Sequence, residues 1–273
     1  MKLLIVGHGF VGSAVQYGFS HPEVDITIVD PKYDVHIDDV DVSSFNVVFV
    51  CVPTPFGDNG IDSTILDNVM NYLIPKQPQQ WPTVIIKSTV TADVLSKYDK
   101  THIVYNPEFL TEKSANEQFI NPQFHVFGGN PMTTQIVSKL YQKYSLCNPC
   151  PEFHMTMQEA SFVKYTINSF LATKVLFFNQ IYDAANQAGV DFNTIIKAVG
   201  LDNRIGHSHT KVPGFDYKQG YGGACFPKDT SAFTKFSNKL TLLEECIKIN
   251  NDYRSQYELD NREIEQNVNY GQT

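Results

Sequence analysis

The chain has little of what marks a secreted or membrane-spanning protein. Its five cysteines in 273 residues form no even framework of the kind that cross-links small secreted domains, which favours a reducing compartment. No apolar run approaches the roughly 18 residues that span a bilayer, and the apolar segment at the N-terminus is too short for a signal peptide. We therefore predict a soluble, cytoplasmic protein that has no membrane partner.

Positive charge is also in short supply, since 21 lysines and arginines face 29 aspartates and glutamates. The net charge of −8 argues against nucleic acid as the main partner, because a protein that binds a phosphate backbone needs positive charge. An anionic substrate would need a local cationic pocket. The one close cysteine pair, Cys147 and Cys150, has no second pair to complete a zinc site, so no metal is predicted.

The first half of the chain alternates short apolar runs with helical stretches. The runs are rich in Val and Ile and are bounded by Gly or Pro, as in strands of a parallel sheet that is buried on both faces. They lie at residues 2–6, 24–30, 45–52, 83–89, 102–107 and 124–129. This alternation predicts an α/β domain of the Rossmann type, with a doubly wound parallel sheet, over residues 1–148.

The second half of the chain is helical. From about Thr156 to Gly189, apolar residues recur at spacings of three and four without a proline, which predicts one long central helix. Asp191 caps a short helix after it, and helical patterns return after a glycine-rich loop. Prolines break the pattern in "YSLCNPCPEF", so we place a mostly α-helical domain at residues 149–273.

A glycine pattern directly follows the first predicted strand. Gly7, Gly9 and Gly12 form G-x-G-x-x-G at the start of a helix. The first glycine permits a tight turn, the second lets the backbone approach a pyrophosphate, and the third lets helix and strand pack closely. Asp30 ends the second strand, where a carboxylate accepts both hydroxyls of a ribose and repels a 2′-phosphate. The pattern favours NAD over NADP; the alternative is a glycine turn that binds no nucleotide.

Polar residues follow three later strands. Thr54 comes after the third strand, and Ser88 and Thr89 come after the fourth, where ligands of open α/β sheets bind. Glu108 and Glu112 follow the fifth strand at a spacing of four, so a helical turn would place them on one face. A solvated acidic turn is the alternative for the two carboxylates.

The predicted long helix carries two further candidates. Lys164 and Asn168 are four residues apart and share a face whose other members are small or apolar. A buried lysine needs an anion, and an asparagine can orient a water or a hydroxyl. The alternative is a lysine whose charged end reaches solvent from an amphipathic helix.

The stretch "GYGGACFPKDT" at residues 220–230 places a cysteine just before a predicted helix. Cys225 would lie at the helix N-terminus, where the helix dipole and Lys228 favour the reactive thiolate. Asp229 lies four residues further on and could orient a water or a lysine. The alternative is a small, buried cysteine in a packed turn.

Seven stretches in one order resemble the UDP-glucose/GDP-mannose dehydrogenase family, and the UDP-glucose 6-dehydrogenases most. They are "GHGFVG", "VPTP", "KSTV", "NPEFLTE", "VKYTINSFLATKVLFFNQI", "RIG" and "GYGGACFPKD". The resemblance covers residues 1 to about 255. It implies an NAD-dependent, four-electron oxidation of the primary alcohol of a nucleotide sugar, UDP-glucose foremost, to the carboxylate. Family members are longer and carry a C-terminal nucleotide-binding domain, so we expect a short form without that domain.

The resemblance also implies roles for single residues. Cys225 matches a nucleophile that forms a thiohemiacetal and then a thioester, and Lys164 and Asn168 match residues that stabilise the oxyanion. Glu108 matches the general base of thioester hydrolysis. The residues predicted to be catalytic are Cys225, Lys164, Asn168, Asp229, Glu108 and Thr89.

The fingerprint and the resemblance together predict the binding residues. The predicted cofactor contacts are Gly7, Gly9, Phe10, Val11, Gly12, Asp30, Lys32, Thr54, Ser88, Thr89, Glu112 and Lys228. The predicted substrate contacts are Glu108, Phe109, Leu110, Lys164, Asn168, Arg204, Tyr221, Gly222 and Gly223. Arg204 matches an arginine that in relatives reaches the substrate of the neighbouring subunit. The apolar helix after Tyr165 also has more apolar surface than a small helical domain buries, so we predict a homodimer.

Three other functions fit parts of the pattern. A GDP-mannose 6-dehydrogenase would use the same chemistry. A two-domain 3-hydroxyacid dehydrogenase also pairs a glycine fingerprint with a Lys-x-x-x-Asn helix face, but it needs no cysteine. A non-catalytic chain that only binds NAD would show no turnover of any sugar.

Overall fold

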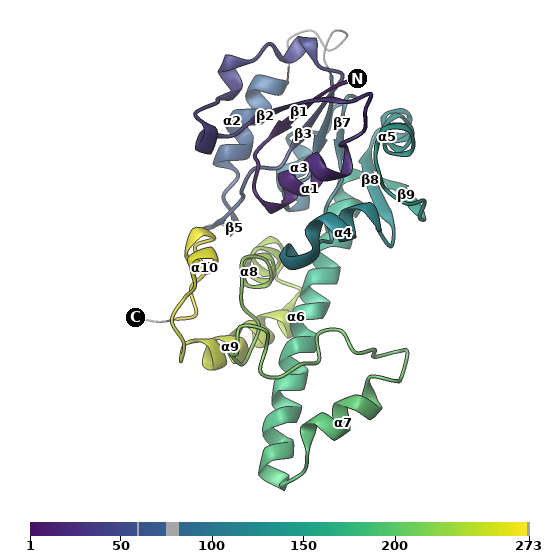
Figure 1. The fold of residues 1–273 in the computed structure, drawn as a ribbon. Helices are drawn as coiled ribbons and strands as arrows, with labels where there is room; N and C mark the ends of the chain where they lie inside the picture. Colours follow the sequence, from purple (N-terminus) through teal and green to yellow (C-terminus); the bar gives the residue numbers. More distant parts are fainter. Residues whose placement is uncertain (59, 75–81, 272–273) are drawn as a thin grey trace. The chain divides into compact units, whose positions relative to one another are not determined.

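The computed structural model of the protein describes residues 1–58, 60–74 and 82–271. The chain divides into two compact units (Figure 1). The first consists of Met1–Thr54 with Asp62–Lys164, and the second of Pro55–Ile61 with Tyr165–Thr273.

A seven-stranded sheet forms the centre of the first unit, in the order β2-β1-β3-β6-β7-β8-β9. Its strands are β1 Lys2–Val6, β2 Asp25–Val29, β3 Val47–Val50, β6 Thr83–Ile86, β7 Ile103–Tyr105, β8 His125–Gly129 and β9 Glu152–Met155. The predicted α/β doubly wound fold is confirmed. The expectation that the sheet is parallel throughout is wrong at one pair, because β7 and β8 are antiparallel while every other paired neighbour in this sheet is parallel.

The strands at the centre of this sheet are buried on both faces. All four residues of β3 are completely buried, as are Leu3, Leu4 and Ile5 of β1. The helices of this unit are α1 Phe10–Gly18, α2 Thr64–Leu73, α3 Ala92–Ser96, α4 Ala115–Ile120 and α5 Pro131–Tyr144. Helix α5 packs beside β8 and β9, as Figure 1 shows. Helices and loops cover both faces of the sheet, and for this reason the strand sequences are apolar at successive positions instead of alternating with polar residues.

The predicted long helix is present as α6, Met157–Ala188. Its first turn packs closely on β8, since a Cβ at Gly128 would lie 2.7 Å from the Cβ of Ala160. Gly189 follows the last helical residue with a φ of +70°, a conformation in which glycine commonly ends a helix. In the part of the chain that the structure describes, no helix has both the length and the apolar character to cross a membrane.

The second unit consists of helices, loops and one short hairpin. Besides most of α6 it contains α7 Phe192–Val199, α8 Phe226–Phe236, α9 Thr241–Arg254, α10 Asn261–Glu265 and the strands β4 Phe56–Gly57 and β5 Gly60–Ile61. Asp191 caps α7 as predicted, because its side chain accepts a hydrogen bond from the N–H of Asn193 at 3.0 Å. The hairpin β4–β5 was not predicted, and it packs on α8.

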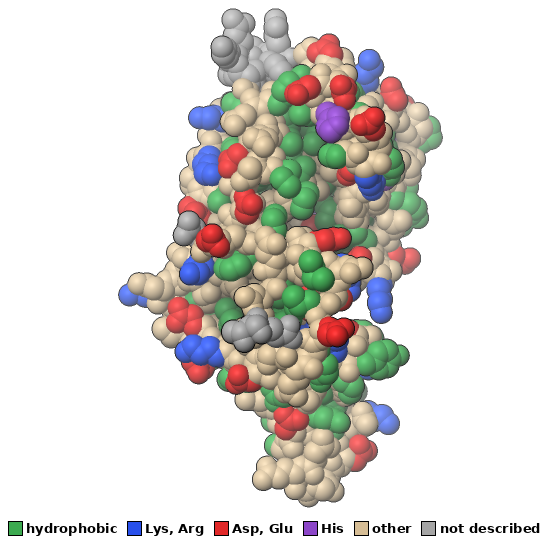
Figure 2. Space-filling model, turned by 90° about the vertical axis from the view of Figure 1, so that its left-hand side faces the viewer, with side chains coloured by type: hydrophobic (Ala, Val, Ile, Leu, Met, Phe, Trp, Pro, Cys, Tyr) green, Lys and Arg blue, Asp and Glu red, His purple; other side chains and the backbone are tan. Residues whose placement is uncertain are grey.

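Charged side chains of both signs mix on one face of the molecule (Figure 2). On the face drawn in Figure 2, acidic and basic side chains alternate over short distances among the described residues. Such a mixed surface agrees with the moderate net charge of the sequence.

Candidate active site

The turn between β1 and α1 has two glycines that the fold requires. Gly7 has a φ of +88°, and a Cβ there would lie 2.6 Å from the carbonyl oxygen of Cys51. At Gly12, a Cβ would lie 2.1 Å from the carbonyl oxygen of Gly7. A side chain at either position would therefore force β1, α1 or the neighbouring loop to move.

Gly9 differs from these two glycines. Its φ of −75° suits any residue, and a Cβ there would meet no described atom within 4 Å. Gly9 is also the N-cap of α1, so no side chain occupies the space before the N–H groups of Phe10 and Val11. The fold would therefore tolerate a side chain at position 9. A pyrophosphate that approaches the backbone closely would not, and this explains a glycine at this position.

Asp30 lies directly after β2, at the same edge of the sheet. Its Oδ2 accepts a hydrogen bond from the N–H of His8 at 2.6 Å, and its Oδ1 accepts one from the N–H of Lys32 at 2.9 Å. Each carboxylate oxygen has a second lone pair, so both remain able to accept a ribose hydroxyl. The Nζ of Lys32 donates to the carbonyl oxygen of His8. Together with Gly9, these residues fit the adenosine and pyrophosphate parts of NAD.

His8 holds this turn in place and was not singled out from the sequence. Its Nδ1 lies 2.9 Å from the hydroxyl of Tyr33, and its Nε2 lies 2.9 Å from Oε1 of Gln16 in α1. The imidazole therefore joins the segment after β2 to the first helix. Its only signal in the sequence was its place between Gly7 and Gly9.

Thr54, Ser88 and Thr89 join two loops at the edge of the sheet. The hydroxyl of Thr54 donates to the carbonyl oxygen of Thr89 at 2.8 Å, and that of Ser88 donates to the carbonyl oxygen of Val52 at 2.7 Å. Thr54 and Ser88 are buried. Their hydroxyl protons thus stabilise the loops after β3 and β6, while their oxygens remain acceptors.

Glu108 and Lys164 form a buried ion pair at the end of β7. The Nζ of Lys164 lies 3.0 Å from Oε1 of Glu108 and donates to its carbonyl oxygen at 2.6 Å. Oε2 of Glu108 accepts from the N–H of Leu110 at 2.6 Å, and the ring of Phe109 lies 5.6 Å from Nζ. Lys164 is 3% exposed. The alternative of a lysine that reaches solvent is therefore wrong.

Glu112 does not share a face with Glu108. Residues 106–111 are not helical, and the short 3₁₀ helix of Glu112–Ser114 begins only afterwards. In a helical turn the N–H of Leu110 would donate to the carbonyl oxygen of Asn106, but it donates to Oε2 of Glu108, and the carbonyl oxygen of Asn106 accepts from Lys87. Glu108 is buried and paired with Lys164, whereas Glu112 is exposed.

Lys87 is a second buried lysine, and it was not singled out from the sequence. The Nζ of Lys87 donates to the carbonyl oxygen of Asn106 at 3.0 Å and to its Oδ1 at 2.9 Å. The hydroxyl of Tyr141 donates to the same Oδ1 at 2.7 Å. Burial lowers the pKa of Lys87 to about 8, with nearby Cys51 and Glu108 acting in the opposite direction. The Lys87 network fixes the start of the segment that carries Glu108.

The second unit places the candidate cysteine where the sequence predicted it. Cys225 is the N-cap of α8, it is half-buried, and Pro227 lies in the first turn. Asp229 is 1% exposed; its Oδ2 accepts from Nδ2 of Asn168 and its Oδ1 from Nζ of Lys228, both at 2.6 Å. Three predicted site residues are thus in one buried hydrogen-bonded set next to the helix start.

The loop before Cys225 is held by its backbone. The N–H of Tyr221 donates to Oδ1 of Asn250 at 2.7 Å, and its carbonyl oxygen accepts from Nδ2 of Asn250 at 3.0 Å. Tyr221 is 3% exposed. Arg204 is exposed, and its guanidinium makes two hydrogen bonds with the carboxylate of Asp202, at 3.0 and 2.6 Å. Tyr221 therefore shapes the loop, whereas Arg204 lies on the surface.

Two family models together cover most of the chain. Residues 32–145 match the NAD binding domain of the UDP-glucose/GDP-mannose dehydrogenase family, and residues 158–252 match its central domain. The chain belongs to this family. The predictions of the family and of an NAD-binding domain are confirmed.

Relatives within the UDP-glucose/GDP-mannose dehydrogenase family include curated and solved proteins. The UDP-glucose 6-dehydrogenase of Rhizobium meliloti is 30% identical over 230 residues, which cover 77% of this chain and 51% of the relative. That of Campylobacter jejuni is 30% identical over 295 residues, covering 94% and 73%. A UDP-glucose dehydrogenase from Pyrobaculum islandicum has a similar structure, with a TM-score of 0.76, 26% identity, and coverage of 94% and 69%. The chain spans about half the length of the Rhizobium meliloti relative.

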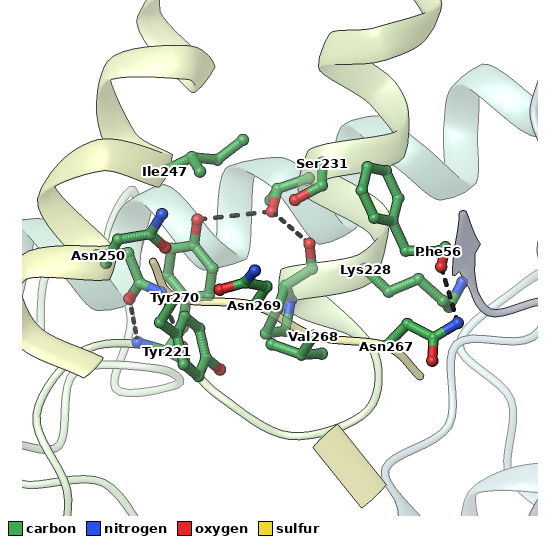
Figure 3. A pocket seen from close by; sticks show the side chains of 13 residues that line it. Phe56, Tyr221, Lys228, Ser231, Ile247, Asn250, Asn267, Val268, Asn269 and Tyr270 are labelled. Carbon is green, nitrogen blue, oxygen red and sulfur yellow. Dashed lines mark hydrogen bonds between the residues drawn. The ribbon is translucent and has the colours of Figure 1, made fainter. Parts of the chain in front are cut away.

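In this family member, a small pocket lies within the second unit (Figure 3). Its volume of about 60 Å³ holds a few waters but not a nucleotide sugar, which needs several hundred Å³. Amide side chains of α9 and of the segment after α10 surround it. The lining residues are Phe56, Tyr221, Pro227, Lys228, Thr230, Ser231, Ile247, Asn250, Asn251, Asn267, Val268, Asn269 and Tyr270.

Proposed function

We propose that the chain oxidises the primary alcohol of a nucleotide sugar to the carboxylate with NAD, and that UDP-glucose is the first candidate substrate. The observation that carries the proposal is Cys225 at the N-terminus of α8, on the same helix as the buried Asp229 and Lys228. An oxidation that stops at a ketone or aldehyde needs no such cysteine. The named relatives are UDP-glucose dehydrogenases, which favours UDP-glucose among the sugars.

The proposed reaction removes two hydrides from one carbon. The alcohol first loses a hydride and its hydroxyl proton to become an aldehyde. The thiol of Cys225 adds to the aldehyde carbon, and the thiohemiacetal loses a second hydride and a proton to become a thioester. Water then cleaves the carbon–sulfur bond, which releases the carboxylate and restores the thiol. Two NAD molecules, bound one after the other, would each accept one of the two hydrides.

The buried charges suit the proposed steps. Lys164 would stabilise negative charge that develops on the sugar oxygen, and the amide of Asn168 would donate to the same oxygen. Glu108 would accept the proton of the attacking water. Its pairing with Lys164 keeps the carboxylate oriented in a buried environment before the substrate binds. Asp229 would hold Asn168 and Lys228 in place through the hydrogen bonds described above.

We further propose that two copies pair through α6. Phe170 and Phe177 are 65% and 55% exposed and lie seven residues apart, hence on one helix face. A second copy would cover both rings and would bring the exposed Arg204 close to a partner. Light scattering at micromolar concentration measures the mass; a single-chain mass would overturn this part. Because the reaction requires a reduced thiol at Cys225, we place it in the reducing cytoplasm.

A panel of nucleotide sugars tests the proposed reaction. The chain is mixed with NAD and each sugar, NADH is followed by its absorbance, and the product mass is determined. We expect two NADH for each sugar consumed and a carboxylate product, with UDP-glucose and GDP-mannose compared directly. Cys225→Ser should form no carboxylate. Full turnover by Cys225→Ser on a hydroxyacid would establish the 3-hydroxyacid dehydrogenase alternative instead, and NAD binding without any turnover would establish the non-catalytic one.

A further inference from the structure

Glu263 of α10 is a buried carboxylate that the proposed reaction does not use. It is completely buried, and it lies beyond residues 158–252, which match the family's central domain. Its Oε1 accepts hydrogen bonds from Nη2 of Arg254 and the hydroxyl of Tyr270, both at 2.8 Å, and from the N–H of Gly223 at 3.0 Å. One oxygen therefore joins α9, the segment after α10 and the glycine loop.

The partner of this carboxylate is equally buried. Arg254 is 1% exposed, and its Nη1 donates to Asp216 at 2.7 Å. The rings of Tyr257 and Tyr270 lie 5.9 and 5.5 Å from its guanidinium. Burying an ion pair is a poor way to gain stability alone, because apolar side chains of similar size commonly stabilise as much or more. The directed hydrogen bond to the loop backbone is what an apolar replacement would lose.

The glycine loop lies directly on this ion pair. A Cβ at Gly222 would lie 2.3 Å from Nη2 of Arg254 and 2.6 Å from Oε1 of Glu263. Gly223 has a φ of +78°, and its N–H points at the carboxylate two residues before Cys225. Arg254 and Glu263 thus fix the path of the backbone where it enters α8.

We propose that Glu263 is a positioning residue for Cys225, which it holds at the start of α8 through Gly223. The inference rests on the proposed function for the role of the thiol. It extends the site to a segment outside the family's matched domains. Tyr270 supports the same carboxylate, and it also lines the pocket of Figure 3 together with Tyr221.

Glu263→Gln is the decisive variant, with Glu265→Gln as its control. Glu265 lies on the same short helix, is exposed, and undergoes the same change of charge. In Glu263→Gln we expect kcat to fall by about tenfold or more, which corresponds to about 1.4 kcal/mol. The Michaelis constant for NAD should stay within about twofold, because the dinucleotide turn belongs to the first unit. Glu265→Gln should match the wild type in both.

A second measurement needs no substrate. Iodoacetamide labelling of Cys225, followed by peptide mass spectrometry with Cys225→Ser as the blank, reports how the thiol is presented. We expect Glu263→Gln to label several-fold more slowly at neutral pH, because the thiol leaves the helix start that favours the thiolate. If no sugar is turned over by the wild type, the proposed function fails, and the labelling rate still decides the role of Glu263.

Tyr270→Phe is a second, milder variant that tests the proposal if Glu263→Gln does not fold. It removes one donor to Glu263 and keeps the ring, so we expect a smaller loss of kcat and of labelling rate, of about two- to fivefold. Melting temperature and NAD affinity show whether each variant is folded. The proposal is overturned if Glu263→Gln folds and its kcat and labelling rate equal those of the wild type. If Glu263→Gln does not fold, the same result in Tyr270→Phe overturns it.

Discussion

Replacing Gly9 with alanine should separate NAD binding from folding. A Cβ at Gly9 meets no described atom within 4 Å, and the φ of −75° is open to alanine. Alanine is a poorer N-cap than glycine by roughly 0.5–1 kcal/mol. It also lowers the entropy of the unfolded chain, which stabilises by roughly 0.4–1 kcal/mol. These effects offset one another, so the melting temperature should change by no more than about 3 °C for a chain of this length.

The same methyl group should interfere with the cofactor. If a pyrophosphate approaches the backbone at Gly9, the methyl group overlaps it at a cost of about 1–3 kcal/mol. That cost corresponds to roughly a 5- to 150-fold weaker affinity for NAD. Isothermal titration calorimetry with NAD measures the affinity, and a thermal melt without NAD measures the stability.

Gly12→Ala is the matched control for this experiment. Its Cβ would lie 2.1 Å from the carbonyl oxygen of Gly7, more than an ångström inside ordinary contact, so the turn or α1 must shift. We expect a clear fall in melting temperature even without NAD. Gly9→Ala that binds NAD like the wild type would refute the reasoning about the pyrophosphate. Gly9→Ala that melts as low as Gly12→Ala would refute the reasoning about the fold.

Three further predictions concern buried or paired charges. Lys164→Met should lower the free energy of unfolding by about 3–5 kcal/mol in urea, because Glu108 is left buried without its partner. Burial lowers the pKa of Lys87 from 10.5 to about 8, so between these pH values the unfolded chain binds more protons than the folded chain. The free energy of unfolding of the wild type should therefore rise by about 3 kcal/mol from pH 8 to pH 10.5, relative to that of Lys87→Met. Burial raises the pKa of Asp67, but hydrogen bonds from Tyr98 and other donors outweigh it and hold the pKa below its usual range. Asp67→Asn should therefore lower the melting temperature at pH 7. The difference from wild type should shrink as the pH falls below the usual pKa of 3.8 and vanish below the lowered pKa of folded Asp67.

Apolar runs located the strands well but not their directions. The apolar runs that form β1, β3 and β6 are buried on both faces. Such a run indicates that a strand is buried but gives no information on the direction of the strand in the sheet. The direction of β8 depends on how the chain returns to the sheet after α4, which no run of side chains encodes. β9 was missed because "EFHM" pairs only with β8 at the edge of the sheet, where Phe153 is 51% exposed and apolar side chains are less necessary.

The parts of the candidate site that depend on a short, local sequence pattern could be predicted from the sequence. The glycine fingerprint and the cysteine before a proline are local, and the structure has the turn and the helix start where they predict. Lys87 and Glu263 were missed because only burial distinguishes them from ordinary surface charges. Glu263 meets Gly223 across 40 residues of sequence, a distance at which no spacing rule applies.

The contact of Gly222 with Arg254 and Glu263 also limits how the sequence can change over generations. A side chain at position 222 has no room while Arg254 and Glu263 keep their places. Replacing Arg254 would remove the cation paired with the buried Glu263, and replacing Glu263 would leave Arg254 with Asp216 but without its buried carboxylate. The three positions are separated by up to 41 residues, yet single substitutions among them should be lost by selection. In relatives that share this C-terminal segment, glycine, arginine and glutamate should therefore be inherited as a set, or replaced as a set.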